Sequence, residues 1–378
     1  MSCHRSSRPA QYQSGAALVV ALLIFALAAA LMVGIQRDFT LTMQRGTNHF
    51  TEQQGWAYLR GAEALATVAL RADRALDKQL PAPRDDLTEM WAAEATPYPL
   101  EGDGWLSGQL VDLQGRFNLN LLVSDLPDYD DDGDTGATID PDTEGADVDL
   151  GDAQREDATR SAQTSQSNRD RDRLSPAKQI FIRLLQTLDG VEVSQAKALE
   201  IADAVADFMD ADNQKRLNGA EDDAYRSATP PYRAANQPMA SISELRAVTG
   251  ITREIYTALA PFVTVWPSEG AKLNVLTASA TVLRSLNGDG QLEPLSQEAG
   301  QQLVEAREQG QIVDVESFLA TAAFSVDTEG LNGLLSESTD WFLLSATVEI
   351  AERELQLYSV LQRDGDSIVG RYRTRGEL

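Results

Sequence analysis

An uncharged segment near the N-terminus constrains this chain more than any other feature. Residues 9–36 contain no charged side chain, and residues 15–34 within them are almost entirely apolar. At about 1.5 Å of rise per residue, an apolar helix of this length crosses a bilayer core of about 30 Å. A secretory signal would end at small residues such as Ala28–Ala30, but here the apolar pattern continues through Ile35. We therefore expect one membrane-spanning helix that stays in the protein.

The charged and reactive residues limit what the rest of the chain can do. Arg5 and Arg8 precede the span and favour a cytoplasmic N-terminus with an exported C-terminal bulk. The formal net charge of −26 argues against binding to a nucleic-acid backbone, which needs clustered Lys and Arg. Cys3 is the only cysteine, and His4 and His49 are the only histidines. A disulfide framework is therefore excluded, and a Ser-His-Asp triad or a multi-histidine zinc site is nearly so.

Apolar spacing predicts an α+β fold whose sheet is divided along the chain. Residues 37–78 show the three- and four-residue spacing of an amphipathic helix. Residues 105–123 predict two strands joined by a turn at Gly115, and alternation over 342–350 predicts a later strand. Asp364-Gly365 then predicts a hairpin turn into a last strand. Early and late strands with a long stretch between them indicate one sheet that carries a large insertion.

The first part of the insertion is strongly acidic. Residues 125–157 are rich in Asp and Glu with few apolar side chains, and residues 158–173 are rich in Ser, Gln, Arg and Asp. Such a stretch cannot bury a core and is typical of a flexible loop. Residues 128–133 fit the first half of an EF-hand loop, but Ile139 stands where the bidentate glutamate is required. A solvated loop with at most weak cation binding is therefore the favoured interpretation.

The second part of the insertion predicts helices with a weak internal repeat. Glycines at 190, 250 and 288 each follow the same short apolar pattern, as in helix-hairpin-helix modules. In DNA-binding modules of this kind the glycine turn offers backbone amides to phosphate. Asp189, Glu192, Asp289 and Glu293 surround the turns here, so a glycine that merely permits a tight turn between helices is the preferred interpretation.

Spaced motifs in the insertion and at the N-terminus carry a family resemblance. The insertion contains D-x-x-D-x-D at 207–212, G-A-E-D-x-x-Y at 219–225, P-Y-R-A-A-N-x-P at 231–238 and S-x-x-E-L. At the N-terminus, Gly15 ends a basic leader and Ala16 opens the apolar helix. Together these motifs resemble the K-class minor pseudopilins of type II secretion, over nearly the whole chain. Most pilin-like proteins carry a glutamate at the position of Val20, and its absence is typical of the K class.

The resemblance implies an architecture of an N-terminal transmembrane and spine helix, a small pilin-like antiparallel sheet and a large inserted all-helical domain. We expect the following divisions: a prepilin leader (1–15), the transmembrane and spine helix (16–80), the first part of the sheet domain (81–124), the acidic flexible loop (125–173), the inserted helical domain (174–336) and the C-terminal strands (337–378).

The resemblance also implies a role. It implies prepilin peptidase cleavage between Gly15 and Ala16, with methylation of the new amine, and a place at the tip of the pseudopilus with the minor pseudopilins of the I and J classes. The protein would be a non-enzymatic, single-pass inner-membrane protein with its bulk in the periplasm of a Gram-negative bacterium. The alternative is a membrane-anchored periplasmic DNA-binding or DNA-uptake protein, which the acidic charge disfavours.

Clustered carboxylates in the insertion predict a calcium site. Six acidic residues lie on either side of Gly219: Asp207, Asp210, Asp212, Glu221, Asp222 and Asp223. Carboxylates this close in the chain repel one another unless a cation lies among them, and oxygen ligands without Cys or His select calcium over zinc. Amide oxygens of Asn213 and Asn236 could complete the coordination. A solvated acidic loop is the alternative. The resemblance to the K-class pseudopilins, whose members bind calcium at this place, favours a calcium site.

Overall fold

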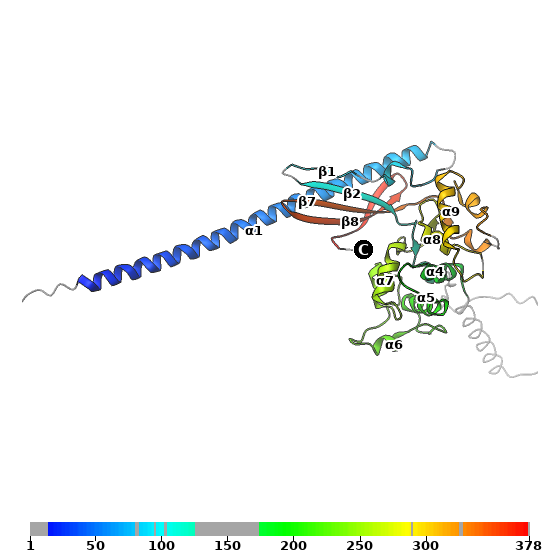
Figure 1. Cartoon of the computed structure of the whole chain (residues 1–378), viewed down its shortest axis with the longest axis horizontal. Coiled ribbons are helices and arrows are strands. Elements are labelled where there is room, and N and C mark those ends of the chain that lie inside the picture. The colour runs from blue at the N-terminus through cyan, green and yellow to red at the C-terminus, as the bar shows by residue number, and fades with distance from the viewer. Residues whose placement is uncertain are drawn as a thin grey trace, which may run out of the picture.

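The computed structural model describes residues 14–79, 83–93, 96–101, 104–124, 174–288, 290–324 and 328–376. Most of the predicted leader and the whole predicted acidic loop, with its EF-hand-like motif, lie outside these residues. In the described part, one long helix projects from a sheet, and the helical domain lies at the end of that helix farthest from the apolar segment (Figure 1).

The long helix α1 (Ser14–Asp77) combines the predicted span and spine in 64 residues. Within the described ranges it is the one helix long and apolar enough to cross a membrane, and its apolar window packs against nothing else in the chain. The predicted long helix is therefore confirmed, and it ends three residues before the expected boundary at 80.

A five-stranded antiparallel sheet lies along the C-terminal part of α1 (Figure 1). Its strand order is β1 (Tyr98–Pro99), β2 (Trp105–Asp112), β7 (Trp341–Ile350), β8 (Arg353–Asp364) and β9 (Ser367–Thr374). Leu110 of β2 lies opposite Leu344 of β7, so strands from both sides of the insertion pair directly. The predicted division of the sheet by an insertion is confirmed.

Two tight turns set the register of the last three strands. Ala351 and Glu352 join β7 to β8 with φ values of 49° and 61°, and Gly365, with φ of 60°, lies in the turn from β8 to β9. Turns whose central residues have positive φ match the right-handed twist of the paired strands. The predicted hairpin at Asp364-Gly365 is thus confirmed.

One face of α1 packs on this sheet. Four of its buried apolar side chains are spaced by three or four residues: Leu59, Ala62, Ala66 and Leu70. They belong to the sheet core that includes Phe342. Two small alanine side chains lie between the two leucines along this face, which lets the helix approach the strands closely. The same face continues to two acidic residues, Asp73 and Asp77, which are also buried.

The inserted domain is built mainly from short helices. They are α2 (Leu121–Ser124), α4 (Pro176–Gln186), α5 (Gln195–Met209), α6 (Asp222–Arg226), α7 (Arg253–Leu259), α8 (Ala280–Ser285), α9 (Gln297–Glu308) and α10 (Val315–Leu319). Short 3₁₀ turns of this domain lie at Ile242–Ala247, Ala260–Phe262 and Glu329–Leu331, and another 3₁₀ turn, Met90–Ala92, lies outside it against α1 and the sheet. Serine side chains at 175, 194, 279 and 296 cap helix N-termini by accepting backbone N–H bonds. The helices enclose one apolar core, which includes Phe181 and Val205.

The domain is not purely helical, and one predicted strand is shorter than expected. Beyond the turn at Gly115, only β3 (Phe117–Asn118) is extended, and it pairs in parallel with β4 (Val263–Thr264) instead of joining the main sheet. The side chain of Asn118 donates to the Pro267 carbonyl at 2.7 Å and accepts from the Asn120 amide. These bonds turn the chain into α2 and end the strand. A second short parallel pair joins β5 (Leu273–Asn274) to β6 (Leu335–Ser336).

Two of the three repeated glycines, Gly190 and Gly250, lie in turns with a positive φ. Gly190 follows α4 with φ of 76°, and Gly250 precedes α7 with φ of 93°, conformations that side-chain-bearing residues rarely adopt. Gly250 also lies close to the buried side of α5, where an added Cβ would be 3.4 Å from Ile201 Cγ1. Both glycines therefore have a structural reason to be in these turns.

Candidate functional site

The C-terminal end of α5 and the start of α6 bring three of the predicted ligands together. Asp210 immediately follows α5 as its C-cap, Asp212 lies two residues later, and Glu221 immediately precedes α6. One carboxylate oxygen from each lies within 4.8 Å of those of the other two. We refer to Asp210, Asp212 and Glu221 as the acidic centre. Residues 211–220 form the loop that returns Glu221 to the end of α5.

Several oxygen atoms at the acidic centre are buried without a partner in the described part of the chain. They are Oδ1 of Asp210, both carboxylate oxygens of Glu221 and Oδ1 of Asn236. Asn236 also donates from Nδ2 to the carbonyl of Asp212 at 3.3 Å, so its amide belongs to the same site. A buried acceptor without a donor is costly. Because all four of these atoms are acceptors, the residues fit a hard cation with oxygen ligands.

Burial and mutual repulsion raise the carboxyl pKa values in this region. Burial, followed by the charges of Asp207 and Asp210, raises the pKa of Glu221 to about 7. Burial also raises the pKa of Asp210 to about 6, although its hydrogen bond from Arg216 opposes the increase. The carboxylates are thus held in an environment that disfavours their charge, and a divalent cation would relieve it.

Arg216 already neutralises part of the charge. Its Nη1 is 2.6 Å from Oδ1 of Asp207 and also pairs with Oδ2 of Asp210, and all three side chains are buried. The backbone N–H of Arg216 also donates to Asp207. Asp207 is therefore engaged by Arg216 and is not among the converging oxygens of the acidic centre. Sequence reasoning missed Arg216, although it is one of only two basic residues between the two acidic groups.

The remaining two predicted ligands lie apart from the acidic centre. Asp222 pairs with Arg226 at 2.6 Å and accepts the backbone N–H of Ala234 at 3.1 Å. Asp223 is fully exposed, with Arg226 at 3.7 Å. Among the six predicted residues, the structure thus gathers the three of the acidic centre, and it places Asn236 beside them.

The predicted processing site lies at the other end of the molecule. Gly15 and Ala16 are exposed in the first turn of α1, and nothing lies within 4 Å of where a Cβ on Gly15 would be. Val20, one turn further along, is also exposed. The described part of the chain therefore places no packing demand on a glycine at position 15.

Comparisons with known proteins show the family of the chain. Two family models, each described as type II secretion system protein K, match residues 115–268 and 273–337. The type II secretion system protein K of Pectobacterium carotovorum is 28% identical over 96% of this chain and 98% of its own length. The protein of that name from Pseudomonas aeruginosa is 30% identical over 94% of this chain and 90% of its own length.

A solved structure gives the same result. The crystal structure of the GspK-GspI-GspJ complex from the enterotoxigenic Escherichia coli type 2 secretion system contains a chain that matches with a TM-score of 0.63. That chain is 25% identical, and the match covers all of it and 88% of the chain described here. None of these similar proteins is described as a DNA-binding or DNA-uptake protein. The chain therefore belongs to the type II secretion system protein K family, the minor pseudopilins of the K class.

Proposed function

We propose that this chain caps the tip of a type II secretion pseudopilus and so supports protein export across the outer membrane. The observation that carries the proposal is the position of the helical domain, at the end of α1 opposite to the apolar segment (Figure 1). In a filament whose apolar helices pack side by side, a subunit stacked above would need the space that this domain fills. A position with nothing above it accommodates the domain.

Val20 supports the same position. A helix inside a filament lies beside neighbours whose free N-terminal amines need a carboxylate partner in an apolar environment. Val20 is exposed on α1 and offers only an apolar side chain. A subunit with no neighbour above it has no such amine to pair.

The solvent-facing side of α1 offers a contact surface for other pseudopilins. Leu65, Val68 and Leu76 are 68%, 60% and 59% exposed and lie outside the face of the helix that packs on the sheet. The similar chain of known structure forms a complex with GspI and GspJ, so we propose that the I- and J-class minor pseudopilins cover this surface. Exposed apolar residues in a row are typical of a protein interface.

Co-purification tests this proposal. We expect the full-length chain to co-purify from membranes with the I- and J-class proteins in a sub-stoichiometric tip complex. Leu65→Asp with Val68→Asp should remove that association, since charges would be buried against an apolar partner. Leu87→Asp, an exposed apolar residue outside α1, is the matched control and should retain it. Homopolymers of this chain, or retained association in the double variant, would contradict the proposal.

The proposed function also implies where the protein lies in the cell and how its N-terminus is processed. α1 would anchor the protein in the inner membrane before assembly, with the sheet and helical domain in the periplasm, and would join the filament afterwards. Prepilin peptidase would cleave between Gly15 and Ala16, and the new amine would be methylated. The work is packing and recognition, so we propose a structural and non-enzymatic role that involves no nucleic acid.

We also propose that the acidic centre binds calcium. Asp210, Asp212 and Glu221 would hold the ion, and the amide oxygen of Asn236 is placed to join them. Calcium accepts six to eight oxygen ligands, which suits the unpartnered carboxylate and amide oxygens of this loop. When bound, the ion supplies the positive charge that Arg216 alone does not provide, and it fixes the loop of 211–220 against α5.

A further inference from the structure

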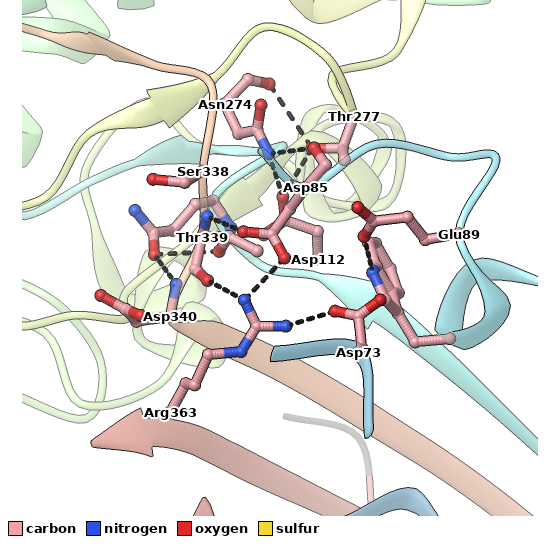
Figure 2. Close-up of polar contacts among 12 residues, drawn as sticks. Asp73, Asp85, Glu89, Asp112, Asn274, Thr277, Ser338, Thr339, Asp340 and Arg363 are labelled. Atoms are coloured by element: carbon pink, nitrogen blue, oxygen red, sulfur yellow. Dashed lines mark hydrogen bonds and ion pairs between the residues drawn. The ribbon is translucent and has the colours of Figure 1, made fainter. Parts of the chain in front are cut away.

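A second acidic group lies near the C-terminal end of α1, just beyond Leu70, the last residue of the helix in the apolar core of the sheet. Asp73 and Asp77, four residues apart, continue that buried face beyond its last apolar contact. The segment 83–93 then brings Asp85 and Glu89 to the same place. One carboxylate oxygen each from Asp73, Asp85 and Glu89 lies within 4.8 Å of the others (Figure 2).

Arg363 of β8 supplies one positive charge to this group. Its Nη2 is 2.8 Å from Oδ2 of Asp73, and its Nη1 is 2.6 Å from Oδ1 of Asp85 (Figure 2). The other oxygen of Asp85 accepts the backbone N–H of Thr339 at 2.8 Å. Asp85 therefore has a partner for both oxygens, and it ties Arg363 to the chain just before β7.

The remaining carboxylates are less well compensated. Arg363 acts on Asp73 and, together with Arg74, on Asp77, and the charges of Asp73, Asp77 and Asp85 all act on Glu89. Negative charge thus exceeds positive charge in a buried place.

Asp77 gives an independent indication of a missing cation. Its side chain is only 3% exposed, and its Oδ2 is buried without a hydrogen-bond partner in the described part of the chain. It lies one helical turn after Asp73 on the same buried face, and its charge acts on both Asp73 and Glu89. A buried carboxylate oxygen without a partner is costly, and a cation at this place would relieve the cost.

We propose that the carboxylates of Asp73, Asp85 and Glu89, with that of Asp77 one helical turn from Asp73, form a second divalent-cation site, separate from the acidic centre of the helical domain. Its ligands are carboxylate oxygens alone, which select a hard cation, and calcium tolerates an irregular set of such ligands better than magnesium. The ion would join the end of α1 to the segment 83–93. Through Asp73 and Arg363 it would also join both to β8.

Terbium luminescence can test the site in the full-length protein in detergent. Trp91 donates from Nε1 to Oε2 of Glu89 at 2.5 Å, so it lies close enough to the site to sensitise Tb³⁺ emission. We expect tryptophan-sensitised emission that Ca²⁺ displaces. Asp77→Asn and Glu89→Gln should each weaken Tb³⁺ binding at this site by on the order of tenfold or more. Glu221→Gln, in the acidic centre, is the matched control and should leave this emission unchanged.

Two further measurements separate a cation site from a merely structural acidic group. Trp91→Phe should reduce the emission while Ca²⁺ binding measured by calorimetry is retained. In chelator, Asp77→Asn should melt at the same or a higher temperature than wild type, because repulsion between carboxylates is removed. In calcium, it should lose part of the Ca²⁺-induced increase in melting temperature. Unchanged emission in Asp77→Asn, or an unchanged Ca²⁺-induced increase in melting temperature, would overturn the proposal.

Discussion

Gly219 lies directly over the Asp207 carboxylate, so closely that a Cβ at position 219 would be 2.7 Å from Cγ of Asp207. It would also lie 3.2 Å from the carbonyl oxygen of Asp203. Asp207 is fully buried and paired with Arg216, so its carboxylate has no room to move away. The glycine is therefore required by the packing of the loop over α5, and not by a positive φ.

Gly219→Ala should destabilise the helical domain by about 3 kcal/mol, because the Asp207–Arg216 pair would be displaced while both charges stay buried. Chemical unfolding followed by circular dichroism would measure the loss. Gly333→Ala, at a glycine with nothing within 4 Å of an added Cβ, is the control and should change stability little. Equal stability of the two variants would show that the loop relaxes around the added methyl group.

The junction between the sheet and the helical domain should respond to pH through Asp112. Oδ2 of Asp112 accepts bonds from Asn274 at 3.1 Å and Thr277 at 2.6 Å, and its Oδ1 accepts from the Gln114 amide. Burial raises the pKa of Asp112 to about 6, although the hydrogen bonds from Thr277 and the Gln114 backbone oppose the increase.

Because the folded state holds this proton more tightly than the unfolded state, the contribution of Asp112 to stability is present at low pH and is lost as pH rises from about 4 to about 6. The loss is on the order of 3 kcal/mol. The unfolding free energy of wild type, compared with that of Asp112→Asn at the same pH, should therefore fall by about 3 kcal/mol between pH of about 4 and about 6. Asp364→Asn, on the surface hairpin, is the control and should follow wild type. A constant difference between wild type and Asp112→Asn would contradict the prediction.

Processing should depend on Gly15. Gly15→Val should leave an unprocessed precursor in the membrane, since the side chain would hinder a protease that approaches the backbone there. The substitution meets no other part of the described chain, so a folding defect is not expected. Gly34→Val in the same helix, where an added Cβ also meets nothing, is the matched control and should be processed normally. Mass spectrometry of the mature N-terminus distinguishes the outcomes, and an N-terminus after Ala30 would contradict the pilin-type cleavage.

The local sequence pattern was sufficient to predict the long helix and the divided sheet. The apolar spacing from Leu59 to Leu70 follows helical periodicity, and alternation over β7 follows strand periodicity, so each element shows in its own residues. The pattern failed after Gly115. The residues that follow it alternate like a strand, but side-chain bonds from Asn118 and Asn120 to distant carbonyls turn the chain into a helix.

The two acidic groups differ in how far sequence could reveal them. The members of the acidic centre are close in the chain, so their clustering is visible in the sequence, but the pairing of Arg216 with Asp207 depends on how the loop folds. The second group joins Asp73 and Glu89, which are near each other in the chain, to Arg363, which most of the chain separates from both. Only the packing of α1 on the sheet brings them together.

Calcium should stabilise the helical domain through the acidic centre. Binding to the folded state alone raises stability by an amount that grows with ion concentration, about 2.7 kcal/mol at about one hundred times the dissociation constant. Asp212→Ala and Glu221→Gln should each remove most of the calcium-induced increase in melting temperature that belongs to this centre, because each removes a charged oxygen ligand. Asp223→Asn, at an exposed carboxylate apart from the centre, is the control and should retain that increase. Thermal unfolding of each variant with calcium and with chelator measures the effect. If Asp212→Ala keeps the full wild-type increase, the acidic centre does not bind the ion.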